Sequence, residues 1–393
     1  MAKNTHLEHL EDDILNQGKQ GGFNAIAFLR ELGKMLSQPQ SGIRVTTKWD
    51  GAPAIICGTN PITGNFFVGT KSVFAKDAKI IESPEAADRY YSGQLAQKLK
   101  DSYRYLSTLG ISGVVQGDLL FTDDKREGNI NGEQCYIFQP NTIVYAVPKN
   151  SDMGRKVARA KLGIVFHTTY TGSSFDNMSA SFGANVAGND DVITFSANFQ
   201  DASGVARLTP AENGEFTRLV NRAEGSLRQA SSFLTLLGQT GTSKFMMNVL
   251  FKQFFNSYIR QGRAIRDANA VTNDFAMYYA SLLDKEIASK KTKTAQDKYK
   301  KMKEDGLKFL NANKRSVYFT VASYMNLIEA KNFIIRRLER VQTLGTFLRT
   351  ENGYKVTAPE GFVAIRSGNA LKLVDRLEFS RANFTADKNW DKA

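Results

Sequence analysis

The sequence has few of the residues that build disulfide frameworks and zinc sites. Its 393 residues include only two cysteines, Cys57 and Cys135, both within apolar runs, and three histidines, His6, His9 and His167. Two unpaired thiols in apolar surroundings are typical of a protein in a reducing compartment, so we expect no disulfide framework. The histidines lack the spacing of metal ligands, which argues against a zinc site.

Long apolar runs are also missing. No run approaches the roughly 20 residues of a membrane span. The stretch 1–13 is charged and has no apolar core of a signal peptide. With 42% hydrophobic and 23% charged residues, the composition is typical of a folded protein rather than of a disordered one. We therefore expect a cytoplasmic protein without membrane contacts, large enough for two domains.

Acidic residues are outnumbered by basic ones. Against 52 Lys and Arg stand 39 Asp and Glu, which gives a net charge of +13. This excess favours a polyanionic partner, because neutralising phosphates releases counterions; a merely basic surface is the alternative. Between residues 285 and 315, 11 basic residues stand against four acids. We expect nucleic acid to bind the lysines of this segment, namely Lys290, Lys291, Lys293, Lys300, Lys301 and Lys303.

The periodicity of apolar residues predicts an α+β protein. Residues 1–40 show helical spacing, and residues 43–205 mainly show strands and turns, with one helix over 84–109 and loops over 171–189. A capping box at Thr209-Pro210-Ala211-Glu212 then begins a block that stays helical to about residue 349. We predict a helical insertion or lobe, 206–350, in a strand-rich domain formed by 1–205 together with 351–393.

One motif, Lys48-Trp49-Asp50-Gly51, falls between two strand-like runs. A lysine that strands hold rigidly at a turn suits covalent catalysis, since its amine can attack the α-phosphate of a nucleotide. Asp50 would take a ribose hydroxyl, and Gly51 would let the backbone approach a ligand closely. A plain hairpin turn with solvated charges is the alternative, because Asp-Gly is a common turn pair.

Three further charged residues lie in or beside apolar strands. Asp118 interrupts the run 114–121, Glu360 precedes a strand, and Lys372 lies within 371–374. Charged groups in such places are costly unless they are paired or bind a ligand. Together with Lys48 they form an ordered series of one nucleophile, two acids and a second cation on separate strands.

This series resembles the motifs of the covalent nucleotidyltransferase superfamily, which includes ATP-dependent DNA ligases, RNA ligases and mRNA capping enzymes. Five segments match motifs of the family. They are Lys48-Trp49-Asp50-Gly51 (motif I), Val68-Gly69-Thr70-Lys71-Ser72 (motif Ia), Gly117-Asp118 (motif III), Glu360-Gly361-Phe362-Val363 (motif IV) and Leu371-Lys372-Leu373 (motif V). They are scattered over most of the chain.

The resemblance implies an antiparallel-sheet adenylation domain that uses ATP and Mg²⁺, with Mn²⁺ as a substitute. Lys48 would become adenylated, Lys372 would contact the α-phosphate, and Glu360 would help to bind the metal. Asp118 would contact the ribose, and Tyr145, or alternatively Phe138, would take the place of the aromatic residue that stacks on the base.

Basic residues near motif Ia complete the expected site. In the family, a basic residue at the position of Lys71 meets nucleic acid or nucleotide. Lys76 lies five residues further on, and we expect both lysines at the mouth of the cleft.

The chain also departs from the family pattern. Ala52 stands where an arginine is usual, Asp118 where a glutamate is usual, and motif V has one lysine instead of two. The 20 residues after Leu373 are too few for an OB-fold domain. The resemblance is therefore to compact phage-type RNA ligase-like proteins, which implies sealing of 5′-phosphate to 3′-hydroxyl ends, RNA favoured over DNA. A catalytically degenerate nucleic-acid-binding or virion-associated protein, and nucleotidyl transfer to another acceptor, stay open.

Overall fold

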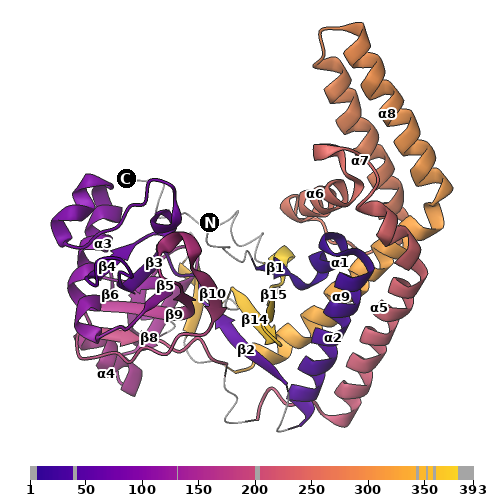
Figure 1. Ribbon diagram of the computed structural model, residues 1–393. Coiled ribbons are helices and arrows are strands. Elements are labelled where there is room, and N and C mark those ends of the chain that lie inside the picture. The colour runs from indigo at the N-terminus through magenta and orange to yellow at the C-terminus, as the bar shows by residue number, and fades with distance from the viewer. Residues whose placement is uncertain are drawn as a thin grey trace.

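The computed structural model describes residues 7–38, 42–130, 132–199, 204–341, 345–350, 353–356 and 360–378. It confirms the α+β class, with about 51% helix and 21% strand in open sheets. A strand-rich lobe and a helical lobe lie on either side of a small sheet, which we call the connecting sheet (Figure 1).

The strand-rich lobe contains two mainly antiparallel sheets. The first has the order β10-β9-β5-β3-β4 with β11 beside β9, and its strands are β3 (Ala54–Thr59), β4 (Phe66–Gly69), β5 (Val114–Phe121), β9 (Leu162–Thr171), β10 (Ser179–Phe182) and β11 (Val192–Thr194). The second has the order β13-β12-β8-β7-β6, with strands β6 (Arg126–Ile130), β7 (Glu133–Phe138), β8 (Val144–Pro148), β12 (Gly345–Thr350) and β13 (Gly353–Val356). Apolar side chains such as Phe121, Phe138 and Val165 pack between the two sheets.

Short helices cover this lobe. The segment predicted as one helix over 84–109 forms a 3₁₀ helix (Pro84–Arg89), helix α3 (Gly93–Leu106) and a final 3₁₀ turn (Ser107–Leu109), and α4 (Asp152–Arg159) follows β8. Strand β10 lies inside the predicted loop 171–189, because its backbone pairs with β9, a contact that Gly- and Ser-rich composition does not reveal.

The connecting sheet has the order β1-β15-β14-β2, with strands β1 (Glu8–His9), β15 (Asn369–Leu373), β14 (Gly361–Arg366) and β2 (Ile43–Lys48). Alternate residues of a strand point to opposite faces. Val45, Ala364 and Leu371 therefore pack on the helical lobe, within its large apolar core. The opposite face is left for polar residues such as Lys48 and Lys372.

The helical lobe comprises α1 (Asp13–Asn16), α2 (Gly18–Ser37), α5 (Pro210–Leu237), α6 (Met247–Arg260), α7 (Ala268–Ala288), α8 (Lys293–Ala312) and α9 (Lys314–Leu338). The predicted capping box is present: the Thr209 side chain accepts from the Glu212 backbone N–H, and the Glu212 carboxylate accepts from the Thr209 N–H at 2.9 Å. Helices α7 and α8 form a hairpin that projects from the lobe (Figure 1).

The boundaries of the helical lobe differ from the predicted ones at both ends. Helix α2 packs against α5, because its buried stripe, which includes Ala25, Leu29 and Leu32, shares one core with that helix. The N-terminal helix thus lies with the helices and not with the sheets. At the other end, residues 345–350 form β12, which pairs with β8 of the strand-rich lobe.

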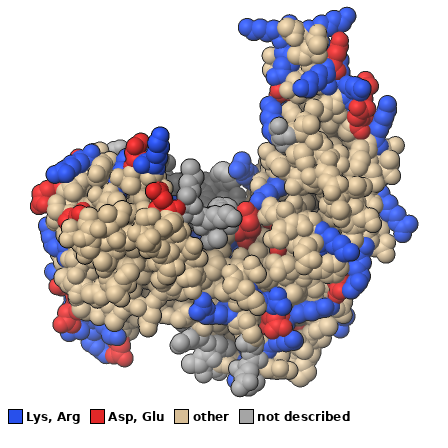
Figure 2. Space-filling view, viewed as in Figure 1, with Lys and Arg blue, Asp and Glu red and all other residues tan. Residues whose placement is uncertain are grey.

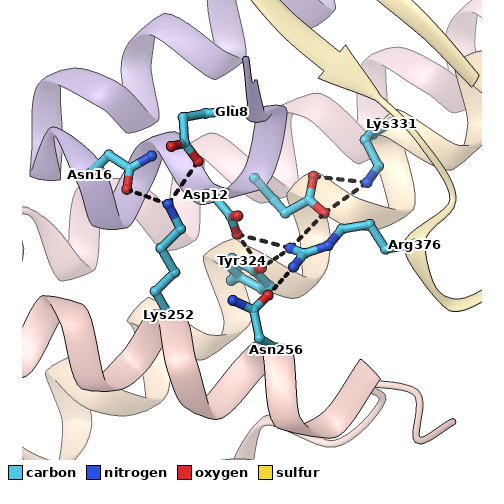
Figure 3. A network of polar contacts seen from close by, with 9 residues as sticks. Glu8, Asp12, Asn16, Lys252, Asn256, Tyr324, Lys331 and Arg376 are labelled. Atoms are coloured by element: carbon cyan, nitrogen blue, oxygen red, sulfur yellow. Dashed lines mark hydrogen bonds and ion pairs between the residues drawn. The ribbon is translucent and has the colours of Figure 1, made fainter. Parts of the chain in front are cut away.

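A network of buried polar contacts ties the segments that follow β1 and β15, at one edge of the connecting sheet, to the helices (Figure 3). Lys331 of α9 donates to both carboxylate oxygens of Glu11 at 2.8 Å, and both side chains are 1% exposed. Arg376, just after β15, donates to Asp12 at 3.0 Å, and Asp12 also accepts from the Tyr324 hydroxyl at 2.6 Å.

Within the described residues, no helix has both the length and the apolar character that a membrane span needs.

Candidate active site

A cleft of about 1080 Å³ lies where the connecting sheet meets the six-stranded sheet. Four of the predicted site residues line it, namely Lys48, Lys71, Asp118 and Lys372. They come from segments far apart in the sequence, and the fold brings them to one surface. The expected grouping of a candidate nucleophile, an acid and further cations is thus present in one cleft.

Strand register places Lys48 and Lys372 on the same face of the connecting sheet. Val363 of β14 pairs with both Lys372 and Thr46, and Lys48 follows Thr46 by two positions. Directly paired residues share a face, as do residues two apart on one strand. Burial, followed by the charge of Lys48, lowers the pKa of Lys372. The two cations are therefore close enough to act on one anionic group.

Glu360 forms an ion pair with Lys48, and its side chain is only 14% exposed. Burial raises the pKa of Glu360, while the charge of Lys48 opposes that shift. The next residue, Gly361, has φ of +143°, and a Cβ there would lie 2.5 Å from the Leu373 carbonyl oxygen. Glycine is thus required at this position, and it lets Glu360 reach the end of β2.

Asp50 differs from the expectation that it contacts a ribose. Its side chain is buried, and its two carboxylate oxygens accept hydrogen bonds from the Asn141 amide at 2.8 Å and from the backbone N–H groups of Thr142 and Ile143 at 2.7 and 2.8 Å. Burial raises the pKa of Asp50, and these three bonds oppose the shift. Asp50 fastens the turn after β2 to the segment before β8.

Gly51 and Tyr145 are likewise structural. A Cβ on Gly51 would lie 2.6 Å from the Asp118 Cβ, so the glycine permits close approach to β5 rather than to a ligand. Tyr145 is 1% exposed, its ring stacks on Phe138, and its hydroxyl accepts from the Asp50 N–H at 2.7 Å. A ring packed in this way offers no free face to a nucleobase, which corrects the expected role of Tyr145.

Trp49 completes the anchoring of the turn. Its indole N–H donates to the Ser196 carbonyl at 3.3 Å, and its ring lies 5.3 Å from that of Tyr145 and 5.4 Å from that of Phe195. Thus Trp49 and Asp50 are both anchored by contacts with the strand-rich lobe. The side chain of Lys48, by contrast, lines the cleft and pairs with Glu360.

One histidine lines this cleft and another lies on the neighbouring strand β1, and sequence reasoning assigned a role to neither. His9 pairs with Lys372 in the parallel β1–β15 ladder. Burial, followed by the charges of Arg376 and Lys331, lowers the pKa of His9. His167 lines the cleft, with its Nε2 3.4 Å from an Asp118 carboxylate oxygen. The spacing of histidines in a sequence can indicate a metal site. It does not reveal a histidine that reaches a site through the pairing of strands far apart in the sequence.

A family model matches residues 4–388, which is nearly the whole chain. The chain belongs to the family DUF6267. That family is described as one of unknown function. No curated protein and no solved structure matches the chain. Membership of DUF6267 therefore names no activity, and any function has to be argued from the cleft itself.

The residues of this DUF6267 chain suit a metal only in part. In the described ranges, no group of three or more His, Cys, Asp or Glu could hold an ion. Asp118 lies close enough to Glu360 to raise the pKa of that carboxyl. Mg²⁺ is commonly held by one or two carboxylates together with substrate phosphates. Both carboxylates have other neighbours here, Lys48 for Glu360 and His167 for Asp118, so the metal role expected of Glu360 stays a prediction.

The lysines predicted to bind nucleic acid lie away from the cleft. Figure 2 shows Lys and Arg side chains gathered at the end of the α7–α8 hairpin. Three of them are paired with acids: Lys290 with Glu286 at 2.6 Å, Lys300 with Asp297 at 3.4 Å and Lys303 with Asp284 at 2.7 Å. The other three, Lys291, Lys293 and Lys301, form no ion pair with any residue that the structure describes. Lys76 is exposed near Lys71 but does not line the cleft.

Proposed function

We propose that the protein is an ATP-dependent, polynucleotide ligase-like nucleotidyltransferase with a covalent lysyl-AMP intermediate on Lys48. The observation that supports this most is the turn after β2. In this turn, Asp50 and Trp49 form hydrogen bonds within the protein, and Gly51 packs closely against β5. Lys48 instead lines the cleft, together with Lys71 and Lys372. Rigid presentation of one amine among cations suits attack on a phosphate.

The proposed first step forms a bond between Lys48 Nζ and the α-phosphorus of ATP and breaks the bond from that phosphorus to the bridging oxygen of pyrophosphate. The amine must give up a proton in this step. The Glu360 carboxylate contacts the amine, and burial raises its pKa, so it is placed to take that proton. Lys372 would stabilise charge on the α-phosphate. Mg²⁺ carried by the triphosphate would supply charge neutralisation for the leaving pyrophosphate.

In the proposed second half, AMP passes to a 5′-phosphate end, and a 3′-hydroxyl then displaces AMP to join the strands. This half rests on the motif resemblance and on the excess of basic residues. The finer ligase-type fold and the preference for RNA belong to the same proposal. The lysines of the α7–α8 hairpin would contact the phosphate backbone.

The ion pair between Lys48 and Glu360 also supports a second candidate function. In this alternative the protein has a ligase-type fold and binds nucleic acid without catalysis. Lys48 and Glu360 belong to neighbouring strands, so their pairing would also serve to join β2 to β14. The loss of the second motif V lysine favours this candidate. Transfer of a nucleotide to an acceptor other than a polynucleotide is a further variant of the enzyme.

The test is covalent labelling with each of the four ribonucleoside triphosphates. We expect label from ATP that carries the label in the α-phosphate, none from ATP labelled in the γ-phosphate, and loss of the label when pyrophosphate is added. Lys48→Arg should give no label, because arginine stays protonated. Label from GTP alone would favour a capping-type transfer. Absence of label from every nucleotide, with nucleic-acid binding intact, would favour the non-catalytic candidate.

A further inference from the structure

A second cavity, of about 490 Å³, lies in the helical lobe between α7 and the beginning of α9, and we call it the α7–α9 pocket. Its volume is within the range that small ligands occupy. Among the described residues that line it, none is acidic, and none also lines the cleft around Lys48. The lining that matters for its chemistry consists of Lys314, Arg315, Tyr318 and Phe319 of α9 and of Asn269 and Asn273 of α7.

Helical spacing places cations and aromatic rings on one face of α9. Lys314 lies four positions before Tyr318, and Arg315 lies four positions before Phe319, so each cation is one turn from a ring. The guanidinium carbon of Arg315 is 5.7 Å from the centre of the Phe319 ring. Both rings are partly buried and pack against the apolar core of the helical lobe. The core therefore anchors the two rings, and both still line the pocket.

The two cations of the pocket have no acid beside them. Neither Lys314 nor Arg315 forms an ion pair or a side-chain hydrogen bond with any residue that the structure describes. A comparable group between α6 and α7 differs in this respect. There the Arg263 guanidinium lies 4.0 Å from the centre of the Tyr258 ring and also pairs with Asp274 at 3.3 Å. The cations of the α7–α9 pocket are therefore left for an anionic ligand.

Cations, aromatic rings and amides in one pocket match the chemistry of a nucleotide within a single strand. Lysine and arginine neutralise phosphates, and an aromatic face stacks on a base of any kind. The side-chain amides of Asn269 and Asn273 both donate and accept, as the edges of bases do. Bases inside a duplex are stacked on their neighbours, so an unpaired nucleotide is the one that can use the ring.

We propose that the α7–α9 pocket binds one nucleotide of a single-stranded polynucleotide, with Lys314 and Arg315 at its flanking phosphates and Tyr318 stacked on its base. This inference rests on the proposed polynucleotide partner. It adds a contact that involves neither the cleft nor the lysines near the end of the α7–α8 hairpin. Phe319 orients the Arg315 guanidinium, which lies over its ring.

The experiment measures the fluorescence anisotropy of labelled oligouridylate, oligodeoxythymidylate and a DNA duplex of equal length over a range of salt concentrations. The variants are Lys314→Gln/Arg315→Gln, Tyr318→Leu and Tyr318→Phe. The matched control is Lys19→Gln/Arg218→Gln, which removes the same charge from two exposed residues that form no ion pair with any described residue. Urea unfolding confirms that each variant is folded.

Lys314→Gln/Arg315→Gln should weaken binding of both single strands. It should also reduce the slope of log affinity against log salt by about 1.4, because each of two phosphates contributes about 0.7. Tyr318→Leu should lower the affinity for single strands about tenfold, the scale of one lost base stack, and leave the slope unchanged. Tyr318→Phe keeps the ring and should bind as wild type does. Duplex binding should not respond to Tyr318→Leu.

The inference would be overturned by single-strand binding that is equal in wild type and Tyr318→Leu, by an equal loss in the Lys19→Gln/Arg218→Gln control, or by a wild-type protein that binds neither single strand. The two proposals fail separately, because labelling of Lys48 by ATP should be unchanged in every variant. The expected binding pattern without any covalent label would overturn the nucleotidyl transfer and keep the pocket. Labelling by a protein whose pocket variants bind as wild type does would have the opposite meaning.

Discussion

Asp50 fixes the direction in which Lys48 points. Its buried carboxylate accepts three hydrogen bonds from residues 141–143, two of them from backbone N–H groups. Removing an acceptor leaves buried donors unsatisfied, and hydrogen bonds to charged groups are among the stronger ones. The turn after β2 therefore depends on a carboxylate that is engaged by hydrogen bonds within the protein.

We expect Asp50→Ala to lower the free energy of unfolding by about 2–3 kcal/mol, the scale of lost hydrogen bonds to a charged group. Asp77 is exposed and forms no ion pair or side-chain hydrogen bond with any residue that the structure describes, so Asp77→Ala is the matched control and should stay within about 0.5 kcal/mol of wild type. Urea unfolding measures both. Equal stability of the two variants would show that Asp50 does not anchor the turn.

Glu339, at the end of α9, makes the stability of the fold depend on pH. Burial, followed by the charges of Glu378 and Asp375, raises its pKa to about 7. A raised carboxyl pKa means that the folded state keeps the proton up to a higher pH than the unfolded state does. Ionised Glu339 thus destabilises the fold above about pH 7, and this cost fades as the pH falls toward the ordinary value near 4.5.

Glu339→Gln should therefore stabilise the protein at about pH 8 and change little at about pH 5, because the protonated acid and the amide are both neutral. After allowance for partial solvent screening, the gain should be about 1–2 kcal/mol. Denaturant unfolding at the two pH values checks this. A gain of the same size at both would mean that ionisation is not its cause.

Among the elements, strands β1 and β15 depend most on buried charge. Lys331 and Glu11 are paired with almost no exposure to solvent, and Arg376 lies 3.6 Å from the same carboxylate (Figure 3). A buried pair that loses one partner leaves an uncompensated charge in a medium that solvates it poorly. The pair therefore controls how firmly both strands attach to the helical lobe.

Lys331→Met should lower the free energy of unfolding by about 3–5 kcal/mol, because Glu11 loses its nearest cation. The double variant Glu11→Leu/Lys331→Met should recover most of this loss, since Arg376 still has Asp12 as a partner at 3.0 Å. Chemical unfolding of the single and double variants is the measurement. A double variant no more stable than the single one would contradict this account.

The α7–α8 hairpin offers its own control for nucleic-acid binding. Replacing the unpaired Lys291, Lys293 and Lys301 by Gln should weaken binding of single-stranded nucleic acid. It should also reduce the slope of log affinity against log salt by about 2, since each neutralised phosphate contributes about 0.7. The paired Lys290, Lys300 and Lys303 are already neutralised by acids. The same replacement there should have the smaller effect. Equal losses in the two sets would contradict the distinction between paired and unpaired lysines, and no loss in either set would leave the hairpin without this role.

Local signals predicted several elements well. The capping box at Thr209 and Glu212, and the short strand that carries Lys372, follow from residues within a few positions of each other. Long-range pairing was beyond such signals. The Tyr145 hydroxyl reaches Asp50 across 95 positions, and β12 joins β8 rather than the helices before it. The β-bulge at His167, where β9 pairs with β5, depends on the register of two strands, which alternation of apolar residues does not reveal.

At the scale of the whole molecule, the connecting sheet joins both lobes to one cleft. Its apolar face completes the core of the helical lobe, and its polar face presents Lys48 and Lys372. The partner of Lys48 comes from the opposite end of the chain, since Glu360 precedes β14. The candidate site therefore exists only when the N-terminal, helical and C-terminal segments have all assembled.

The central claim is that Lys48 becomes covalently adenylated in this cleft. Mass spectrometry of the intact protein after incubation with ATP and Mg²⁺, followed by peptide mapping, tests it most directly. The account predicts a mass increase of one AMP, confined to the peptide that contains Lys48 and absent in Lys48→Ala. An adduct on another lysine, or no adduct with any nucleotide, would contradict it.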